Sequence, residues 1–299
     1  MRILLLGKSG QVGWELQRAL APLGGVTSLG RGENSEGLSG DLADPSTLAD
    51  TVTCVVPDVI VNAAAYTAVD KAESDPQQAR AVNALAPKVL AREAARIGAL
   101  LVHYSTDYVF DGSGTRPWRE DDPTGPLSVY GRTKLEGEQA IIGSGCRHLI
   151  FRTSWVYAAR GGNFAKTMLR LARERESLSV IDDQVGAPTG AELIADITGH
   201  AIRKAQAGAP VGIYHLAAGG ETSWWQYARF VLEQAAEAGV ELKVRPEAVE
   251  PIPSSAYKVA AQRPLNSRLD TTRLQTAFDI TLPPWQHGVA RMLTEVLGK

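Results

Sequence analysis

The strongest constraint on the fold is the opening segment, where a short apolar run gives way to regularly spaced glycines. Residues 2–7, RILLLG, are typical of a buried strand, and residues 11–23, QVGWELQRALAPL, have the pattern of a helix. Gly7, Gly10 and Gly13 stand at this junction with G-x-x-G-x-x-G spacing. Glycines allow a tight turn and close backbone approach, and the free N–H groups of a helix start favour an anion. The segment therefore predicts a strand–turn–helix unit that binds the pyrophosphate of a dinucleotide.

Two other interpretations of this glycine turn were weighed. The spacing departs from the G-x-G-x-x-G dinucleotide fingerprint, so a purely turn-forming role for the glycines stays open. The tripeptide GKS also suggests a phosphate-binding P-loop, but that motif needs a glycine five residues before Gly7, where Arg2 stands. The P-loop is therefore rejected.

Strand-like and helix-like segments alternate through the first half of the chain. Further strands are expected at 58–64, 99–106 and 147–154, and a long alanine-rich helix at 76–98, where Pro87 argues against a smooth cylinder. This alternation predicts an α/β fold, a Rossmann-like doubly wound parallel sheet covered by helices on both faces.

The second half is less regular and predicts a smaller, partly interleaved C-terminal lobe that binds substrate. Residues 1–155 are expected to form the dinucleotide-binding domain, with later segments returning to it, and residues 156–299 mainly the lobe. Helices are expected near 163–176, 190–206, 223–239 and the C-terminus, with one short strand at 213–217.

Composition excludes several classes of function. The net charge of -2 offers no general basic surface for nucleic acid, and no apolar run approaches the length that spans a membrane. The opening apolar run is too short for a signal peptide, and Cys54 and Cys146 are expected to be reduced, which favours a cytoplasmic protein. The five histidines show no metal-binding spacing.

A second strand is expected at residues 26–30, VTSLG, and the residues at its end bear on the choice of dinucleotide. In this fold an acidic residue there usually holds the adenosine ribose, but this chain has Gly30 followed by Arg31. An arginine suits a 2′-phosphate, which favours NADPH over NADH, although Arg31 could equally be a solvated surface residue. Asp41 is a candidate partner for the adenine amino group, with helix capping as its alternative role.

Tyr130 and Lys134 are four residues apart, so on a helix they lie on one face. A cation beside a phenol favours phenolate, and lowering a tyrosine pKa by about 3 units needs roughly 4 kcal/mol of differential stabilisation. A tyrosine tuned in this way can give a proton to a carbonyl oxygen as hydride arrives at its carbon. Without other evidence, a tyrosine and a lysine at this spacing are more often an ordinary exposed pair on a helix surface than a catalytic pair.

Three neighbouring segments favour the catalytic interpretation. Ser105 and Thr106 end one expected strand, and the segment NAAA, Asn62 to Ala65, ends another. Because the carboxyl ends of parallel strands meet at one edge of a sheet, these segments and the glycine turn should converge on one crevice.

Taken together, these motifs resemble the extended short-chain dehydrogenase/reductase family, and within it the reductases of dTDP-4-dehydrorhamnose. The segments that carry the resemblance run from end to end: GKSGQVGWELQRAL, DVIVNAAAYTAVDKAE, HYSTDYVFDG, YGRTKLEGE, FRTSWVYA, DQVGAPTGAEL and NSRLD. The resemblance implies NADPH-dependent reduction of the 4-keto group of dTDP-4-dehydro-β-L-rhamnose, the last step of dTDP-rhamnose biosynthesis, with NADH as the alternative reductant.

The resemblance also assigns roles to residues. Tyr130 would donate the proton. Lys134 would lower the pKa of Tyr130 and hold the nicotinamide ribose, and Thr106 would orient the keto oxygen of the substrate. The residues expected to contact the cofactor are Gly7, Gly10, Gln11, Val12, Gly13, Arg31, Asp41, Leu42, Ala63, Ala64, Ala65, Ser105, Tyr130 and Lys134. The residues expected to contact the dTDP-sugar are Thr106, Asp107, Trp155, Arg263 and Arg268. Some relatives are homodimers with Mg²⁺ at the interface, for which Glu15 and Glu192 are the candidates here.

Three rival functions stay open at this point. A 4,6-dehydratase of the family would carry Asp-Glu after the strand-end threonine, but here Asp107 is followed by Tyr108. An epimerase is harder to separate by motifs. A non-catalytic NADP-binding regulatory subunit could lose the tyrosine–lysine pair, which this chain keeps.

Overall fold

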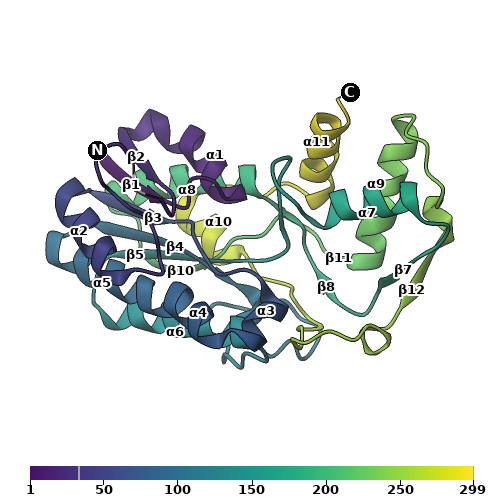
Figure 1. Cartoon of the computed structure of the whole chain (residues 1–299), viewed down its shortest axis with the longest axis horizontal. Helices are drawn as coiled ribbons and strands as arrows, with labels where there is room; N and C mark the ends of the chain where they lie inside the picture. The colour runs from purple at the N-terminus through teal and green to yellow at the C-terminus, as the bar shows by residue number, and fades with distance from the viewer. Residues whose placement is uncertain (33, 299) are drawn as a thin grey trace.

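The computed structural model describes residues 1–32 and 34–298 and is built around a six-stranded parallel sheet (Figure 1). The strand order is β10-β5-β4-β3-β1-β2, and every neighbouring pair is parallel. The strands are β1 Arg2–Leu6, β2 Gly25–Leu29, β3 Val59–Asn62, β4 Leu100–Thr106, β5 His148–Thr153 and β10 Gly212–His215. The order reverses between β1 and β3, and ligands of open α/β sheets bind outside the carboxyl ends of the strands at such a point.

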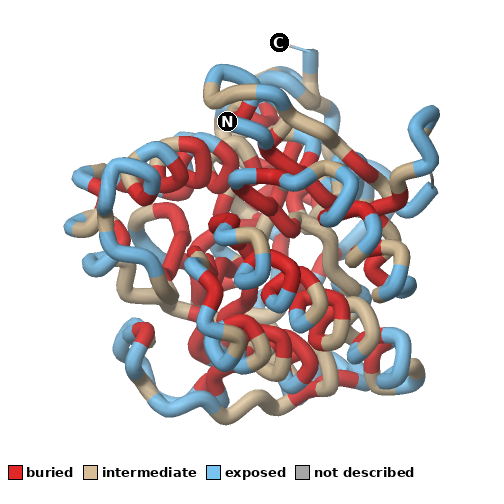
Figure 2. Tube along the Cα trace, turned by 90° about the vertical axis from the view of Figure 1, so that its left-hand side faces the viewer, coloured by how far each residue is buried: buried red, intermediate tan, exposed pale blue. Residues whose placement is uncertain are grey.

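Helices cover both faces of the sheet, as the alternating pattern predicted. One face carries α1 Gln11–Leu20, α8 Ala191–Gln206 and α10 Thr272–Phe278, and the other carries α2 Pro45–Val55, α5 Ala86–Ile97 and α6 Val129–Gly143. The strands read as nearly continuous apolar runs because both of their faces are buried. Figure 2 shows this buried layer inside an exposed outer shell.

The long helix expected at 76–98 is interrupted. Regular helix α4, Pro76–Arg80, leads into a π-helical turn, Ala81–Leu85, before α5 begins with Pro87 in its first turn. Proline lacks the N–H that would bond back into the preceding turn. The expected departure from a smooth cylinder is therefore confirmed.

The second half of the chain forms a lobe at the right of Figure 1 with its own apolar core. Its helices are α7 Phe164–Glu174, α9 Trp224–Glu237 and α11 Trp285–Leu297, and its longest strands, β7 Leu178–Ile181 and β12 Val249–Ile252, pair in parallel. Side chains cap two of these helices: Asn163 caps α7, and Ser223 forms a capping box with Gln226 in α9.

The lobe and the sheet domain are interleaved along the chain. After β7 the chain returns to the sheet for α8 and β10, goes back to the lobe for α9 and β12, and visits the sheet once more as α10. Short elements complete the order: α3 Val69–Ser74, β6 Val156–Tyr157, β8 Val185–Gly186, β9 Thr189–Gly190 and β11 Thr222–Ser223. The division at 155/156 stays a prediction.

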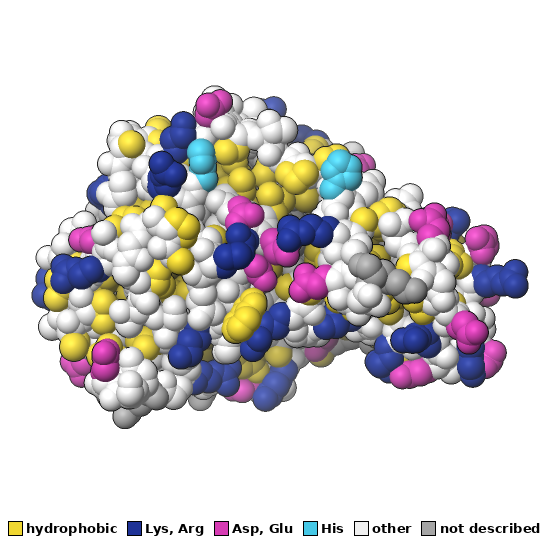
Figure 3. All heavy atoms as spheres, turned by 90° about the horizontal axis from the view of Figure 1, so that it is seen from above, with side chains coloured by type: hydrophobic (Ala, Val, Ile, Leu, Met, Phe, Trp, Pro, Cys, Tyr) yellow, Lys and Arg dark blue, Asp and Glu magenta, His cyan; other side chains and the backbone are white. Residues whose placement is uncertain are grey.

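Among the described residues, no helix combines the length and apolarity needed to cross a bilayer. On the face seen in Figure 3, basic and acidic side chains are interspersed without a large patch of one sign. This mixture agrees with the small net charge.

Candidate active site

The glycine turn is a close-packed strand–turn–helix junction. Gly7 has φ +90°, and a Cβ there would lie 2.7 Å from the backbone nitrogen of Ala64. A Cβ on Gly13 would lie 2.0 Å from the carbonyl oxygen of Gly7. Gly10 is the N-cap of α1, and no side chain caps that helix. The first N–H groups of α1 are therefore free of side-chain partners, which is the arrangement that favours a phosphate.

The same junction brings together the other cofactor candidates near it. Gln11 and Val12 form the first turn of α1, and the Oε1 atom of Gln11 is buried without a hydrogen-bond partner among the described residues. Of the alanines after β3, Ala63 and Ala64 lie against Gly7. A close-packed backbone turn that leads into helix N–H groups free of side-chain partners fits the pyrophosphate of a dinucleotide.

Arg31, Asp41 and Leu42 lie beyond the end of β2 and differ in environment. Arg31 is exposed, and its carbonyl oxygen accepts a hydrogen bond from Ser39. One oxygen of Asp41 accepts the N–H of Ala43, and Leu42 is buried in the core. The alternative role of Asp41 as a helix cap is wrong, because Asp44 caps α2 through the N–H groups of its first turn.

Helix α6 places Tyr130 and Lys134 beside the carboxyl end of β4, where the ligand crevice of this fold is expected. Ser128 caps the helix, and a Cβ on Gly131 would lie 2.3 Å from the carbonyl oxygen of Tyr108, so the helix rests directly on the segment after β4. Tyr130 is half-buried, and Lys134 is only 2% exposed. The pair is therefore not an ordinary solvated helix pair.

The sequence predicts a lowered pKa for Tyr130, and for the protein by itself this prediction is wrong. Burial raises the pKa of Tyr130 to about 12, and an interaction with the Thr106 hydroxyl offsets part of this. Lys134 does not contribute to this shift. Its Nζ atom instead donates to the carbonyl oxygen of Tyr104 at 2.5 Å and lies 3.2 Å from Nε2 of His103. Burial lowers the pKa of Lys134 to about 8.

Thr106 and Asp107 form a buried polar pair at the carboxyl end of β4. The Thr106 hydroxyl donates to Asp107 Oδ1 at 3.0 Å and accepts the N–H of Tyr108 at 3.2 Å. Its proton is therefore already donated, and its remaining acceptor position is available to Tyr130. Burial raises the pKa of Asp107 to about 6, opposed by hydrogen bonds from Ser267 and Thr106. Ser105 Oγ is buried there without a partner among the described residues.

Trp155 occupies the turn between β5 and β6 in an unusual conformation. Its φ is +50°, which favours glycine, and its ring stacks on Trp224 with centroids 3.7 Å apart. A Cβ on Gly186 would meet the ring of Trp155 at 2.9 Å and the side chain of Ser267 at 3.0 Å. Because Ser267 also lowers the pKa of Asp107, this chain of neighbours links Trp155 to the end of β4.

The two candidate arginines lie on the segment that runs beside the loop after β4. Arg263 pairs with Asp70 at 2.7 Å, and Arg268 pairs with Glu221 at 2.7 Å. Both guanidinium groups therefore have carboxylate partners, and neither was expected to be paired. A diphosphate would have to exchange with these partners.

Three residues that the sequence interpretation missed also lie at this site: Asn83, His103 and Ser267. Asn83, in the π-helical turn, donates to the carbonyl oxygen of Tyr66 and to Thr133 in α6. His103 contacts Lys134, and Ser267 contacts Asp107. The available signal for His103 was a titratable side chain inside the otherwise apolar run LLVHYST. Asn83 and Ser267 gave no comparable signal.

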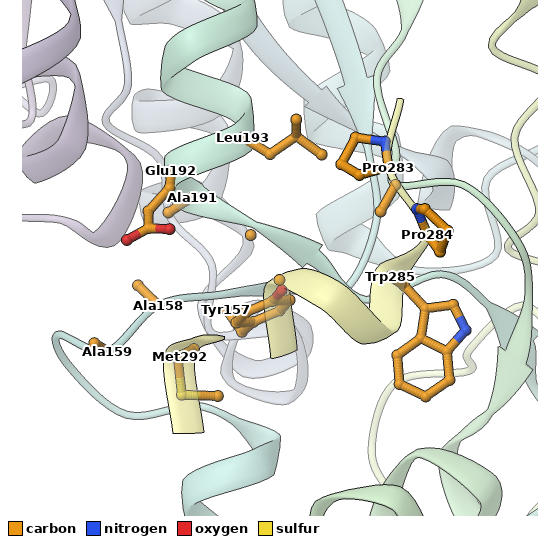
Figure 4. Close-up of a pocket in the computed structure, with 13 residues that line it drawn as sticks. Tyr157, Ala158, Ala159, Ala191, Glu192, Leu193, Pro283, Pro284, Trp285 and Met292 are labelled. Carbon is orange, nitrogen blue, oxygen red and sulfur yellow. The ribbon is translucent and has the colours of Figure 1, made fainter. Parts of the chain in front are cut away.

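A second hollow lies apart from this crevice, between α8 and α11 (Figure 4). Glu192 and Tyr157 face it together with apolar side chains. Burial raises the pKa of Glu192, and the neighbouring carboxylates of Glu15 and Glu295 raise it further, while Arg291 opposes them. Within residues 1–32 and 34–298, no three His, Cys, Asp or Glu side chains are grouped closely enough to hold a metal ion.

Comparison with known proteins gives one consistent family. Residues 1–297 match the family described as RmlD substrate binding domain. The dTDP-4-dehydrorhamnose reductase of Salmonella typhimurium is 56% identical over 297 residues, covering 99% of this chain and 98% of the relative.

Two crystal structures of dTDP-4-dehydrorhamnose reductases are also similar to this chain. The enzyme from Clostridium acetobutylicum has a TM-score of 0.87 and 33% identity over the whole of both chains. The enzyme from Bacillus anthracis, in complex with NADP, has a TM-score of 0.85 and 32% identity, with 98% of this chain and 99% of that chain covered.

Proposed function

This chain belongs to the RmlD substrate-binding-domain family of dTDP-4-dehydrorhamnose reductases, and from that premise we propose that it reduces dTDP-4-dehydro-β-L-rhamnose to dTDP-β-L-rhamnose with NADPH. The observation that carries this proposal is that half-buried Tyr130 lies beside Thr106, and buried Lys134 against Tyr104 and His103, at the carboxyl end of β4. A keto sugar bound there would have a hydroxyl proton beside its oxygen.

The residues of the crevice have separable roles in this reduction. When bound, NADPH supplies the hydride. Tyr130 holds its proton firmly, because its pKa of about 12 keeps the phenol protonated at neutral pH, and a proton donor must be protonated when the substrate arrives. The Thr106 hydroxyl interacts with that phenol, and its proposed role is to orient the phenol oxygen toward the substrate.

The cofactor site would use the glycine turn for the pyrophosphate and Ala63 to Ala65 along the dinucleotide. The close contacts at Gly7 and Gly13 leave no room for larger residues, which supports backbone contact with the phosphates. Arg31 is exposed at the end of β2 and is the proposed contact for the 2′-phosphate. The NADP complex of the Bacillus anthracis relative supports the same preference.

The dTDP-sugar would contact Thr106, Asp107 and Trp155, with Arg263 and Arg268 as candidates for the diphosphate. Both arginines lie on the segment beside the loop after β4, and Arg263 is half-buried next to Asp70. Arginine forms paired hydrogen bonds with phosphate oxygens, so exchange of a surface carboxylate for a diphosphate is chemically reasonable.

A homodimer with Mg²⁺ is a finer proposal that rests on fewer observations. The carboxylates of Glu15 and Glu295 each raise the pKa of Glu192, and a cation would relieve that repulsion. One copy supplies no complete metal site within the described residues, so carboxylates from two copies would be needed. Sedimentation with Mg²⁺ and with EDTA tests this, and a mass that is unchanged between the two contradicts the metal. The cytoplasmic location stays a prediction.

The direct test is consumption of NADPH by the purified protein with dTDP-4-dehydro-β-L-rhamnose. Absorbance of the reduced nicotinamide should fall in proportion to substrate, and an epimerase or dehydratase would give no such net consumption. The kcat/KM should be higher with NADPH than with NADH, and Arg31→Ala should narrow that ratio. No oxidation of NADPH by the wild-type protein would exclude the proposal.

A further inference from the structure

His103 is a wholly buried titratable residue that the proposed reduction does not use. It lies within β4, 1% exposed, and its register partner on β3 is Asn62. A buried imidazole needs partners for both ring nitrogens, and the position of its single proton depends on those partners. The hydrogen bonds around His103 settle which nitrogen carries the proton.

Asn62 decides the role of the first ring nitrogen. The side-chain oxygen Oδ1 of Asn62 accepts the backbone N–H of Ala64 at 3.2 Å. Its amide nitrogen Nδ2 must therefore face the other way, and it lies 3.1 Å from Nδ1 of His103. Because an amide NH₂ group only donates, Nδ1 accepts, and the ring proton of neutral His103 lies on Nε2.

The second ring nitrogen, Nε2, then carries an N–H donor that faces Lys134. Nε2 of His103 lies 3.2 Å from Nζ of Lys134, which also donates to the carbonyl oxygen of Tyr104. An ammonium at Nζ has only donors, so two N–H groups would oppose each other. A neutral amine has a lone pair that accepts the Nε2–H bond.

We propose that His103, held by Asn62 with its proton on Nε2, is a positioning residue that favours the neutral amine of Lys134 and so sets the charge next to Tyr130. This role rests on the proposed reduction, because it matters for catalysis only if Tyr130 is the proton donor. His103 acts through Lys134 and does not touch the reacting atoms.

The other charged groups around Lys134 do not replace this effect. Glu138, one turn along α6, raises the pKa of Lys134, but its carboxylate is bound by Arg152 of β5 at 2.7 Å. Within the described residues, Glu138 is the one charged group that shifts the pKa of Lys134. Burial and the charge of Lys134 lower the pKa of His103 far below its usual range, so its tautomer, not its charge, is the variable.

The decisive measurement is the nitrogen NMR spectrum of histidine-labelled wild-type protein between pH 6 and 8. The ring ¹⁵N shifts distinguish the two tautomers, and we expect the Nε2–H form for the resonance that disappears in His103→Gln. An Nδ1–H form in the wild type overturns the proposal. This measurement needs no turnover, so it stands even if the proposed substrate is wrong.

Asn62→Asp tests the direction of the effect. The new carboxylate accepts a hydrogen bond from Nδ1–H, so the ring proton moves to Nδ1. Nε2 then becomes an acceptor and can bind the ammonium form of Lys134. We expect the Nδ1–H tautomer in this variant and an alkaline limb of the kcat/KM profile about one pH unit higher, a tenfold rise in proton affinity. Gln139→Glu is the matched control, because it adds a carboxylate at an exposed position of α6 without contact to His103, and it should keep the Nε2–H form.

His103→Gln separates the hydrogen bond from the added charge. Its amide can present an oxygen to Nζ with no change in net charge, so the alkaline limb should again rise. If the alkaline limb of the kcat/KM profile keeps its pH in both His103→Gln and Asn62→Asp, while turnover is retained, the proposal is contradicted.

Discussion

The carboxyl-end edge of the sheet and the lobe beside it are both well buried, but they bury different kinds of group. At the sheet edge the buried side chains include Asp107 and Lys134, whose pKa values are shifted toward their neutral forms. The lobe instead buries aromatic rings, such as Tyr227 packed edge-on against Trp285. The sheet edge is therefore arranged at a cost in stability, while the lobe supplies stability.

The largest expected effect is on turnover at the sheet edge. Tyr130→Phe removes the proposed proton donor and should lower kcat by about 10²- to 10⁴-fold, with cofactor binding and the unfolding midpoint nearly unchanged. Steady-state kinetics, NADPH titration and thermal unfolding check this. Tyr214→Phe, which removes a hydroxyl bonded to Pro210 away from the crevice, is the control. Normal turnover in Tyr130→Phe would falsify the donor assignment.

In the lobe, the corresponding large effect should be on stability. Leu232 is fully buried in α9, so Leu232→Ala leaves a cavity and should reduce the free energy of unfolding by about 2–5 kcal/mol. Glu237→Ala, at the exposed end of the same helix, should change it by less than about 0.5 kcal/mol. Denaturant unfolding measures both, and equal losses in the two variants would contradict an independent lobe core.

Asp107 should make the sheet edge sensitive to pH in a way the lobe is not. Its folded pKa of about 6 lies above the ordinary value of 3.8, so the folded state holds the proton more tightly than the unfolded state. Stability from this group is then fully present below about pH 4 and is lost as the pH rises through 6. Asp107→Asn should be more stable than wild type by up to about 3 kcal/mol at pH 7 and equal to it at pH 4. Denaturant unfolding of both proteins measures this difference in stability. A difference between Asp107→Asn and wild type that is the same at pH 4 and pH 7 would rule the prediction out.

Lys134 gives the smallest expected effect on stability, with the opposite dependence on pH. Its folded pKa of about 8 lies below the ordinary 10.5, so folding is disfavoured below pH 8 and the penalty disappears as the pH rises toward 10.5. Lys134→Met removes a penalty of about 3 kcal/mol but loses the bond to the Tyr104 carbonyl, for a net gain of about 1–2 kcal/mol at pH 7. Unfolding should show a gain that shrinks by pH 10, together with loss of turnover. A less stable variant at pH 7 would mean that Lys134 holds the fold together.

How well the sequence predicted each region follows from how local its signals are. The glycine turn and the Tyr130–Lys134 spacing depend on residues a few positions apart, so the sequence was enough to place them on a turn and a helix. The lobe is assembled from separate segments, and the pairing of β7 with β12 joins residues about 70 positions apart. No local pattern encodes such a contact.

The sequence by itself determined the alternating strands and helices, the glycine junction and the face shared by Tyr130 and Lys134, because backbone geometry and apolar periodicity act over a few residues. Only the tertiary structure decided the charge state of the site. It buried Tyr130 and raised its pKa, placed His103 against Lys134, and paired Arg263 with Asp70. The physical reason is that a pKa or an ion pair depends on which groups surround a side chain and how much water they exclude, and those neighbours come from distant parts of the chain.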